Sequence, residues 1–414
     1  MNWFLPLVIF GYPLSVSLAL FFDVQSGAVA LAYRTLVLVY ALLLIGRSFF
    51  VGHGLARTYA WFGIVFFWVL YLLRLTNDAL LAPDSFDRPA SEYAFLAVGA
   101  ALVPSLACLT SFSETQAAKA PRNSILIGLG AVLLLMYTLR AFHLDTLTTA
   151  ERTRFGVLNL NPIYVGHLGA SLALSALVLL KERVRDTRFA RSSVLLLVAG
   201  SGLLLLGISA SRGPLIALLV CLLVLATTSP GLTPLRRMRR AALVGAFAGL
   251  ALLLLSLAEE RFGYVAASRV AALLSGADDP TSQFRLNAYS GAWTQFLESP
   301  WFGSSLEEKS TGQYPHNVVL ESFMATGIFG GAVFVILLVG ATFRALCLLR
   351  REHSGPYAPW VAILFVQYLI GANLSGAIWS NSAMWCLLAA VYACGQPSAS
   401  GLLLRRSYST AASP

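Results

Sequence analysis

The chain is 414 residues long; 57% of its residues are hydrophobic, only 12% are charged, and its mean hydropathy is +0.74. Soluble domains usually carry about 25% charged residues, so this composition excludes an ordinary soluble protein. Apolar runs of about 20 residues, the length that spans a bilayer, recur along the whole sequence. The sequence therefore predicts an all-α polytopic membrane protein.

Twelve transmembrane helices are expected. The N-terminus has neither the basic segment nor the cleavage site of a signal peptide, so the first apolar run is interpreted as a retained span. The third and fifth runs are short, and a polar stretch separates the last two. In chain order, the predicted spans are residues 3–22, 28–46, 59–73, 92–112, 124–139, 162–180, 193–210, 214–228, 241–257, 318–343, 357–372 and 381–395.

The basic residues predict the orientation of these helices. With the N-terminus in the cytoplasm, most of the 29 Lys and Arg residues fall in inner loops and most of the 19 Asp and Glu residues fall outside. This distribution follows the positive-inside rule, so the net charge of +10 reflects topology and requires no nucleic-acid partner. The chain then divides into nine helices (1–257), a long outer loop that contains helices (258–317), three helices (318–395) and a cytoplasmic tail (396–414).

Arginines on the outer side are not favoured by this topology, so each needs a reason. Five of them are interpreted as partners of nearby carboxylates or of lipid headgroups: Arg74, Arg88, Arg140, Arg261 and Arg269. Arg212 differs, because it lies in the tight turn "SASRGP" just before Pro214, a residue suited to the first position of a helix. A helix N-terminus at the membrane surface attracts anions, and Arg212 would add its charge there.

Arg285 opens the stretch "RLNAYSGAWTQFLESPWFG". Leu286, Tyr289 and Trp293 recur there at helical spacing, which predicts an amphipathic helix that starts at Arg285 and packs its apolar stripe against the bundle. Arg154, in an earlier outer segment, adds further positive charge beside another helix that begins with proline.

His316 stands where the outer loop becomes the tenth span. Pro315 suits a helix start, so His316 is expected in the first helical turn. A helix N-terminus and nearby arginines disfavour the imidazolium, so the ring should be neutral near pH 7 and able to accept a proton. The alternative is a histidine that only caps the helix or sits at the interface. Glu321, about one turn deeper, is expected to orient the ring or to pair with an arginine.

Several of these residues together resemble a known signature. His316 and Asn317, followed after nine residues by Gly327 and then by Gly330, resemble the pattern of the bacterial O-antigen ligases. Arg212 in "SRG", Arg285 before Trp293 and "PWFG", and the single long outer loop before the histidine add to the resemblance, which covers roughly residues 150–340 by motif. Ser304 departs from the pattern, because relatives often have a second glycine there.

The resemblance implies a GT-C-like glycosyltransferase in the bacterial inner membrane. Such an enzyme moves O-antigen polysaccharide from undecaprenyl diphosphate to the lipid A–core oligosaccharide on the periplasmic face, with membrane lipids as its other partners. Arginine forks suit a diphosphate, so Arg212, Arg285 and Arg154 would bind the donor.

The acceptor hydroxyl needs a base, and the resemblance assigns that role to His316, with inversion at the anomeric carbon. Asn317 would position a substrate or the imidazole ring, with Tyr314 and Glu321 in support. No DxD motif occurs in the predicted outer segments, so neither a metal nor another cofactor is expected.

Three other functions remain open. An O-antigen polymerase would use the same donor and a second lipid-linked glycan. A protein O-oligosaccharyltransferase would glycosylate serine or threonine, but an enzyme of that kind is expected to have a longer chain with a sizeable soluble C-terminal region. A transporter would place polar groups near the bilayer midplane and show broken helices or inverted repeats, whereas Arg34 is the one clear charge within a predicted span.

Overall fold

A computed structural model describes residues 1–50, 59–83, 86–110, 117–141, 160–183, 189–229, 231–262, 280–351 and 355–394. These residues are predominantly helical, as the sequence predicts. The helices are α1 (Phe4–Phe21), α2 (Ser26–Phe50), α3 (Tyr59–Leu81), α4 (Ala90–Phe95), the π-helical η2 (Leu96–Leu102), α5 (Val103–Cys108), α7 (Ala120–Ala141), α9 (Pro162–Arg183), α10 (Phe189–Ser209), α11 (Arg212–Thr228), α12 (Pro234–Phe262), α14 (Pro280–Glu298), α15 (Val318–Arg350), α16 (Tyr357–Leu374), the short η4 (Ile378–Ser380) and α17 (Ser382–Ala393).

Nine helical segments within the described ranges are long and apolar enough to cross a membrane, so the chain is a polytopic membrane protein. A helix lies at each of the twelve predicted positions, but length and composition support only part of that number. Helix α11 has 17 residues and α17 has 12, fewer than the roughly 20 that a full crossing needs. The predicted tail, residues 396–414, lies outside the described residues.

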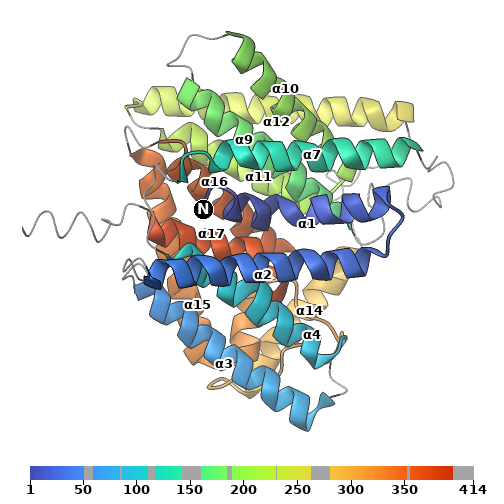
Figure 1. Ribbon diagram of the computed structural model, residues 1–414, viewed down its shortest axis with the longest axis vertical. Helices are drawn as coiled ribbons and strands as arrows, with labels where there is room; N and C mark the ends of the chain where they lie inside the picture. Colours follow the sequence, from blue (N-terminus) through green and yellow to red (C-terminus); the bar gives the residue numbers. More distant parts are fainter. Residues whose placement is uncertain are drawn as a thin grey trace, which may run out of the picture.

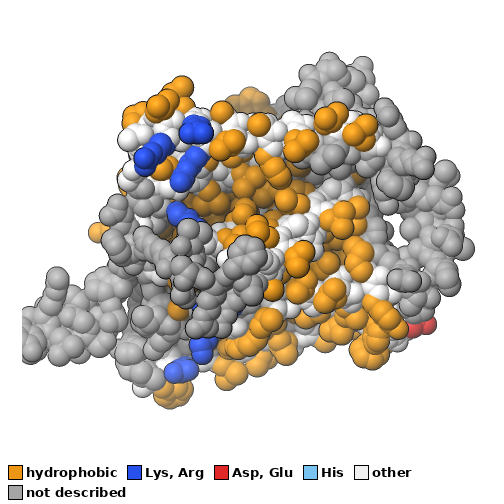
Figure 2. Space-filling model, turned by 90° about the horizontal axis from the view of Figure 1, so that it is seen from above, with side chains coloured by type: hydrophobic (Ala, Val, Ile, Leu, Met, Phe, Trp, Pro, Cys, Tyr) orange, Lys and Arg blue, Asp and Glu red, His pale blue; other side chains and the backbone are white. Residues whose placement is uncertain are grey.

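Helices α2, α1, α7, α9 and α10 lie side by side in this order (Figure 1). Helix α1 packs against α2 and α7, and α9 packs against α7 and α10. Figure 2 shows a face covered with apolar side chains, with Lys and Arg side chains gathered at one end. That end is where α12 begins in Figure 1. An apolar surface with basic residues at one end is what a bilayer and the positive-inside rule require.

Helices α16 and α17 form the centre of the packing. Trp360, Phe365 and Trp385 are fully buried. The ring of Trp385 lies 5.4 Å from that of Phe67 on α3 and 5.3 Å from that of Phe334 on α15, measured between centroids. Such aromatic contacts fix the helices relative to one another. The packing therefore sets where α15 begins relative to the end of α16.

Helix α15 is kinked at Gly327, whose φ of 63° and ψ of −162° are not helical. The turn at residues 300–304 takes up the backbone groups freed there: Ile328 N–H donates to Pro300 O at 2.7 Å, and Ser304 N–H donates to Met324 O at 2.9 Å. The "PWFG" turn and the glycines after His316 are thus one interlocked structure. Ser304 serves this turn through its backbone, so the missing second glycine does not disrupt it.

Arg74 of α3 holds the same junction. Its guanidinium donates to the carbonyl oxygens of Phe302, Gly303, Ser304 and Ala325 at 2.6 to 3.3 Å. It also contacts Asp78 at 3.4 Å, the type of pairing expected from the sequence. One arginine therefore ties α3, the turn and the kink of α15 together.

Gly327→Ala is expected to prevent stable folding. The conformation of Gly327 is almost restricted to glycine, and its strain alone costs of order 1–3 kcal/mol. A Cβ at this position would also overlap the backbone carbonyl carbon of Trp301, so the turn would have to move. Yield after membrane extraction and the thermal unfolding midpoint measure the effect. Gly130→Ala on α7 is the control, because a Cβ there meets open space; equal stability of the two variants would contradict the interlocked junction.

Candidate functional site

The candidate residues gather at one end of the bundle, where α11 and α15 begin and α16 ends; we call it the site end. The Asn317 side-chain amide donates to the carbonyl oxygen of Asn373 at 3.4 Å. A Cβ placed on Gly213 would lie 3.8 Å from Cβ of Leu374, the last residue of α16. The start of α11, which carries Arg212, and the start of α15 therefore both lie against the end of α16.

His316 precedes helix α15 and is not part of its first turn, so the predicted helix start at Pro315 is wrong. The helix begins at Val318, and Asn317 caps it by accepting hydrogen bonds from the backbone N–H groups of Val319 and Leu320 at 3.0 and 3.1 Å. His316 has a φ of 56°, which is uncommon for a residue other than glycine. Such conformations concentrate at functional sites, where the surrounding structure maintains them.

The His316 ring lies among aromatic groups. Its centroid is 4.4 Å from that of Tyr314 and 6.3 Å from that of Phe284 on α14. The Nδ1 atom is buried and has no hydrogen-bond partner within the described part of the chain. Burial, and secondly the charge of Arg285, lower the pKa of His316 to about 4. The neutral ring agrees with the sequence-based expectation, but its main cause is burial rather than a helix N-terminus.

Arg285 lies in the second turn of α14 and is half-buried. The helix starts at Pro280, five residues before the predicted start. The expected packing of the apolar stripe holds only in part: Leu286 and Trp293 are 56% and 49% exposed, whereas the ring of Phe296 lies 5.3 Å from that of Phe323 on α15. Two alanines, Ala288 and Ala292, and the side chain of Gln295 are buried instead. Small residues let α14 approach the turn at residues 300–311 closely, which leaves Leu286 and Trp293 largely exposed.

Arg212 is the first residue of α11 and is half-buried. It follows Ala210, which has a φ of 46°, and the N-cap residue Ser211. Pro214 was predicted to be the first residue of the helix, but it is the third. It still lies within the first turn, whose backbone N–H groups have no partner inside the helix. Arg154, the third predicted donor ligand, lies outside the described residues, as does the side chain of Arg140.

Glu321 is fully buried in the first turn of α15. Its carboxylate accepts hydrogen bonds from the Tyr71 hydroxyl at 3.2 Å and from the backbone N–H of Ile378 at 2.9 and 3.1 Å. Within the described residues, its hydrogen bonds go to these groups and not to His316 or an arginine. Glu321 thus ties α15 to α3 and to the connection between α16 and α17.

Sequence reasoning missed the residues of that connection. The ring of Trp379 lies 6.1 Å from that of Tyr314, and the Arg88 guanidinium lies 5.8 Å from the Trp379 ring centroid. Arg88 also pairs with Glu92 at 2.7 Å and with Asp87 at 4.0 Å. The polar stretch "ANLSGAIWSNS" between two apolar runs was the available signal, because loops that carry function interrupt otherwise regular helices.

The structure defines a multi-pass membrane protein with arginines and a neutral histidine at one end. Residues 192–335 match the family Wzy_C, described as O-antigen ligase. The matched segment contains Arg212, Arg285, His316, Asn317 and the kink at Gly327, so the resemblance drawn from these motifs is confirmed there. The match covers part of the chain, so it shows that residues 192–335 are similar to the O-antigen ligase family. A comparison with curated proteins found no match.

Asn317→Ala is expected to destabilise the protein by about 1 kcal/mol, the usual contribution of an N-cap side chain. His316 adjoins the cap, so its ring should also shift. Asn317→Asp keeps an oxygen at the cap and should recover most of the stability. Thermal unfolding in one detergent measures the first effect, and the pKa of His316 measures the second. If Asn317→Ala matches the wild type in both, the cap does not set the histidine's position.

Proposed function

We propose that this enzyme is a ligase. In this proposal it transfers O-antigen polysaccharide from undecaprenyl diphosphate to the lipid A–core oligosaccharide, on the periplasmic face of the bacterial inner membrane, as a glycosyltransferase of the GT-C type. Both termini would then be cytoplasmic. The observation that carries the proposal is the pairing of a neutral histidine, whose Nδ1 is buried without a hydrogen-bond partner in the described residues, with Arg285 close by.

The proposed reaction is a single displacement. The acceptor hydroxyl attacks the anomeric carbon of the donor, and His316 takes the hydroxyl proton. The bond between the anomeric carbon and the diphosphate oxygen breaks, so undecaprenyl diphosphate leaves with the bonding electron pair and the configuration inverts. No acid is needed for a diphosphate leaving group if its charge is stabilised, and that role falls to Arg212 and Arg285. Arg154 is proposed as a further donor ligand, and no metal is required.

The other predicted residues are proposed to position rather than react. Asn317 caps α15 beside His316, and Tyr314 packs against the imidazole. Glu321 anchors the same helix to Tyr71 and Ile378. A buried imidazole with a lowered pKa is a weaker base than a free one. Efficient proton transfer then requires that the acceptor hydroxyl be held close to the ring in the correct orientation. Tyr314 and Asn317 beside His316, and the anchoring of α15 by Glu321, support that requirement.

The fixed kink in α15 favours a transferase over a transporter. The kink of α15 at Gly327 resembles the interrupted helices of transporters, but the "PWFG" turn and the four carbonyl contacts of Arg74 hold it fixed. A rigid junction beside His316 suits a reaction site that is organised before the substrate binds. Ligase is preferred to polymerase because the motifs around His316 resemble those of ligases.

The direct test is the lipopolysaccharide pattern of cells with and without this protein. Loss of the polysaccharide ladder, with accumulation of long lipid-linked polymer, is expected for a ligase. Accumulation of single lipid-linked repeat units, with one unit attached to the core, would instead identify a polymerase. An unchanged ladder, together with altered glycosylation of serine or threonine in proteins, would identify a protein O-oligosaccharyltransferase.

A further inference from the structure

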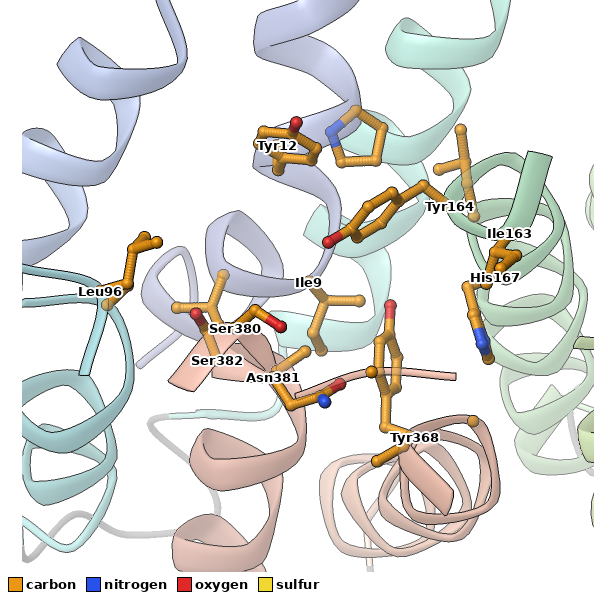
Figure 3. A pocket seen from close by; sticks show the side chains of 18 of the residues that line it. Ile9, Tyr12, Leu96, Ile163, Tyr164, His167, Tyr368, Ser380, Asn381 and Ser382 are labelled. Carbon is orange, nitrogen blue, oxygen red and sulfur yellow. The ribbon is translucent and has the colours of Figure 1, made fainter. Parts of the chain in front are cut away.

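A polar cavity that the proposed reaction does not use lies at the site end. It encloses about 180 Å³ and is formed by α1, α2, η2, α9, α16 and the connection from α16 to α17. Figure 3 shows its side chains. Aromatic rings and polar groups share its wall, which is the usual composition of a small-molecule site. The polar groups that matter here come from Tyr12, Arg34, Tyr164, Tyr368, Ser380 and Asn381.

Arg34 is the charge of this cavity. It is the ninth residue of α2, so it lies roughly 12 Å along the helix from Ser26, at about 1.5 Å per residue. Its guanidinium carbon lies 5.6 Å from the centroid of the Tyr12 ring, and no carboxylate pairs with it among the described residues. A charged side chain inside a membrane-spanning helix is costly and typically marks a binding site or a pathway. Arg34 therefore calls for an anionic ligand.

The aromatic rings supply flat surfaces beside that charge. The rings of Tyr12 and Tyr164 lie 5.3 Å apart, and the ring of Tyr368 stacks on that of His167 at 5.5 Å. In Figure 3 the hydroxyl groups of Tyr164 and Tyr368 point into the space between the helices. Asn381 lies at the same wall and offers both a donor and an acceptor. Apolar faces next to hydroxyl and amide groups match a sugar ring, which has C–H faces and a hydroxyl rim.

Tyr314 connects this cavity to the candidate reaction site. It lines the cavity, and its ring lies 4.4 Å from that of His316. A ligand that fills the cavity would therefore have one end within about one side chain of the proposed base. Arg212 and Arg285 do not line the cavity, so its charge is separate from theirs.

We propose that this cavity binds a phosphate-bearing sugar, with the phosphate on Arg34 and the sugar ring against Tyr12 and Tyr164. The inference rests on the proposed function, since both substrates of that reaction carry sugars and phosphates at the membrane surface. Two sources supply the same chemistry: a phosphorylated sugar of the glycolipid acceptor, or the sugar diphosphate end of the lipid-linked donor. The acceptor is expected, because Arg212 and Arg285 already serve the donor.

The test measures binding in the full chain without requiring transfer. The protein carries His316→Ala, is reconstituted in nanodiscs, and is titrated with three probes: lipid A–core, the same glycolipid after enzymatic dephosphorylation, and undecaprenyl diphosphate. Adding Arg34→Ala should weaken binding of phosphorylated lipid A–core roughly 10- to 100-fold, the loss expected for charge-assisted hydrogen bonds. Adding Arg34→Ala should leave the affinity for the dephosphorylated glycolipid unchanged.

Two further variants test whether the effect is specific to the cavity. Tyr164→Phe retains the ring and removes only the hydroxyl, so it should weaken binding by roughly 3- to 10-fold without affecting folding. Arg47→Ala is the matched control, because Arg47 is exposed in the last turn of the same helix and does not line the cavity; it should leave all affinities unchanged.

Each outcome decides the question. Weaker binding of phosphorylated lipid A–core alone supports the acceptor as the ligand, and weaker binding of undecaprenyl diphosphate alone supports the donor. If Arg34→Ala and Tyr164→Phe leave all three affinities unchanged, the cavity is not a substrate site. If Arg34→Ala weakens binding as expected but deletion of the wild-type protein leaves the lipopolysaccharide ladder of the cells unchanged, the ligase proposal fails and the binding site stands.

Discussion

His316→Ala is expected to lower turnover at saturating donor by about 10²–10⁴-fold, the usual contribution of a general base. Donor binding should be retained, because the proposed diphosphate contacts belong to arginines. Membranes with this variant should keep lipid-linked polymer and form almost no capped lipopolysaccharide. Turnover is measured with purified lipid-linked polysaccharide and lipid A–core, and donor affinity is measured separately by titration.

The pH profile tests the same role. The neutral ring is the base, and it exists above the pKa of about 4 that burial and Arg285 produce. The rate due to His316 should therefore be flat from roughly pH 8 down to pH 5 and should fall at lower pH as the ring becomes protonated. His316→Ala should lack this acidic limb.

The control for this prediction is His353→Ala, which changes a histidine between α15 and α16 in the sequence and should leave rate and profile unchanged. If His316→Ala retains both near-normal turnover and the wild-type profile, His316 is a structural residue before α15. The base would then have to be sought elsewhere.

Arg212→Ala and Arg285→Ala are each expected to reduce kcat/KM by roughly 30-fold or more. Truncating one partner of a hydrogen-bonded charge pair typically costs about 2–5 kcal/mol, and each 1.4 kcal/mol is tenfold. Lysine should restore little activity at either position, because it offers a point charge and no fork for two phosphate oxygens. Both effects should appear in the titration with undecaprenyl diphosphate as well as in the rate.

Arg285→Ala has a second expected effect, which Arg212→Ala should not share, because burial and the charge of Arg285 are what lower the pKa of His316. Arg285 disfavours the imidazolium, so its removal should raise the pKa of His316 part of the way toward 6.5; burial, the larger cause, remains. The acidic limb of the residual activity should move to higher pH. Arg239→Ala, on the exposed start of α12, is the matched control. Full activity in either alanine variant would remove that arginine from the site.

Local properties of the sequence determined the helices and the motifs. Hydropathy and length place a membrane helix without reference to its neighbours, so each predicted span contains a helix. The order of Arg212, Arg285, His316 and the glycines, which also needs no three-dimensional information, pointed to the family that matches residues 192–335. A neutral His316 was likewise predicted, from nearby arginines and a helix N-terminus, but its main cause, burial, comes from the tertiary structure.

Contacts between distant segments decided the rest. Helix α15 begins after His316, later than predicted, because Asn317 caps it. Gly327 adopts a conformation almost restricted to glycine because the turn at residues 300–304 packs against it. Leu286 and Trp293 on α14 are exposed because the small residues of this helix make its close contacts. The cavity around Arg34 is formed by helices far apart in the chain. Periodicity reports only how one helix is built, whereas these features depend on which surfaces meet when the helices pack.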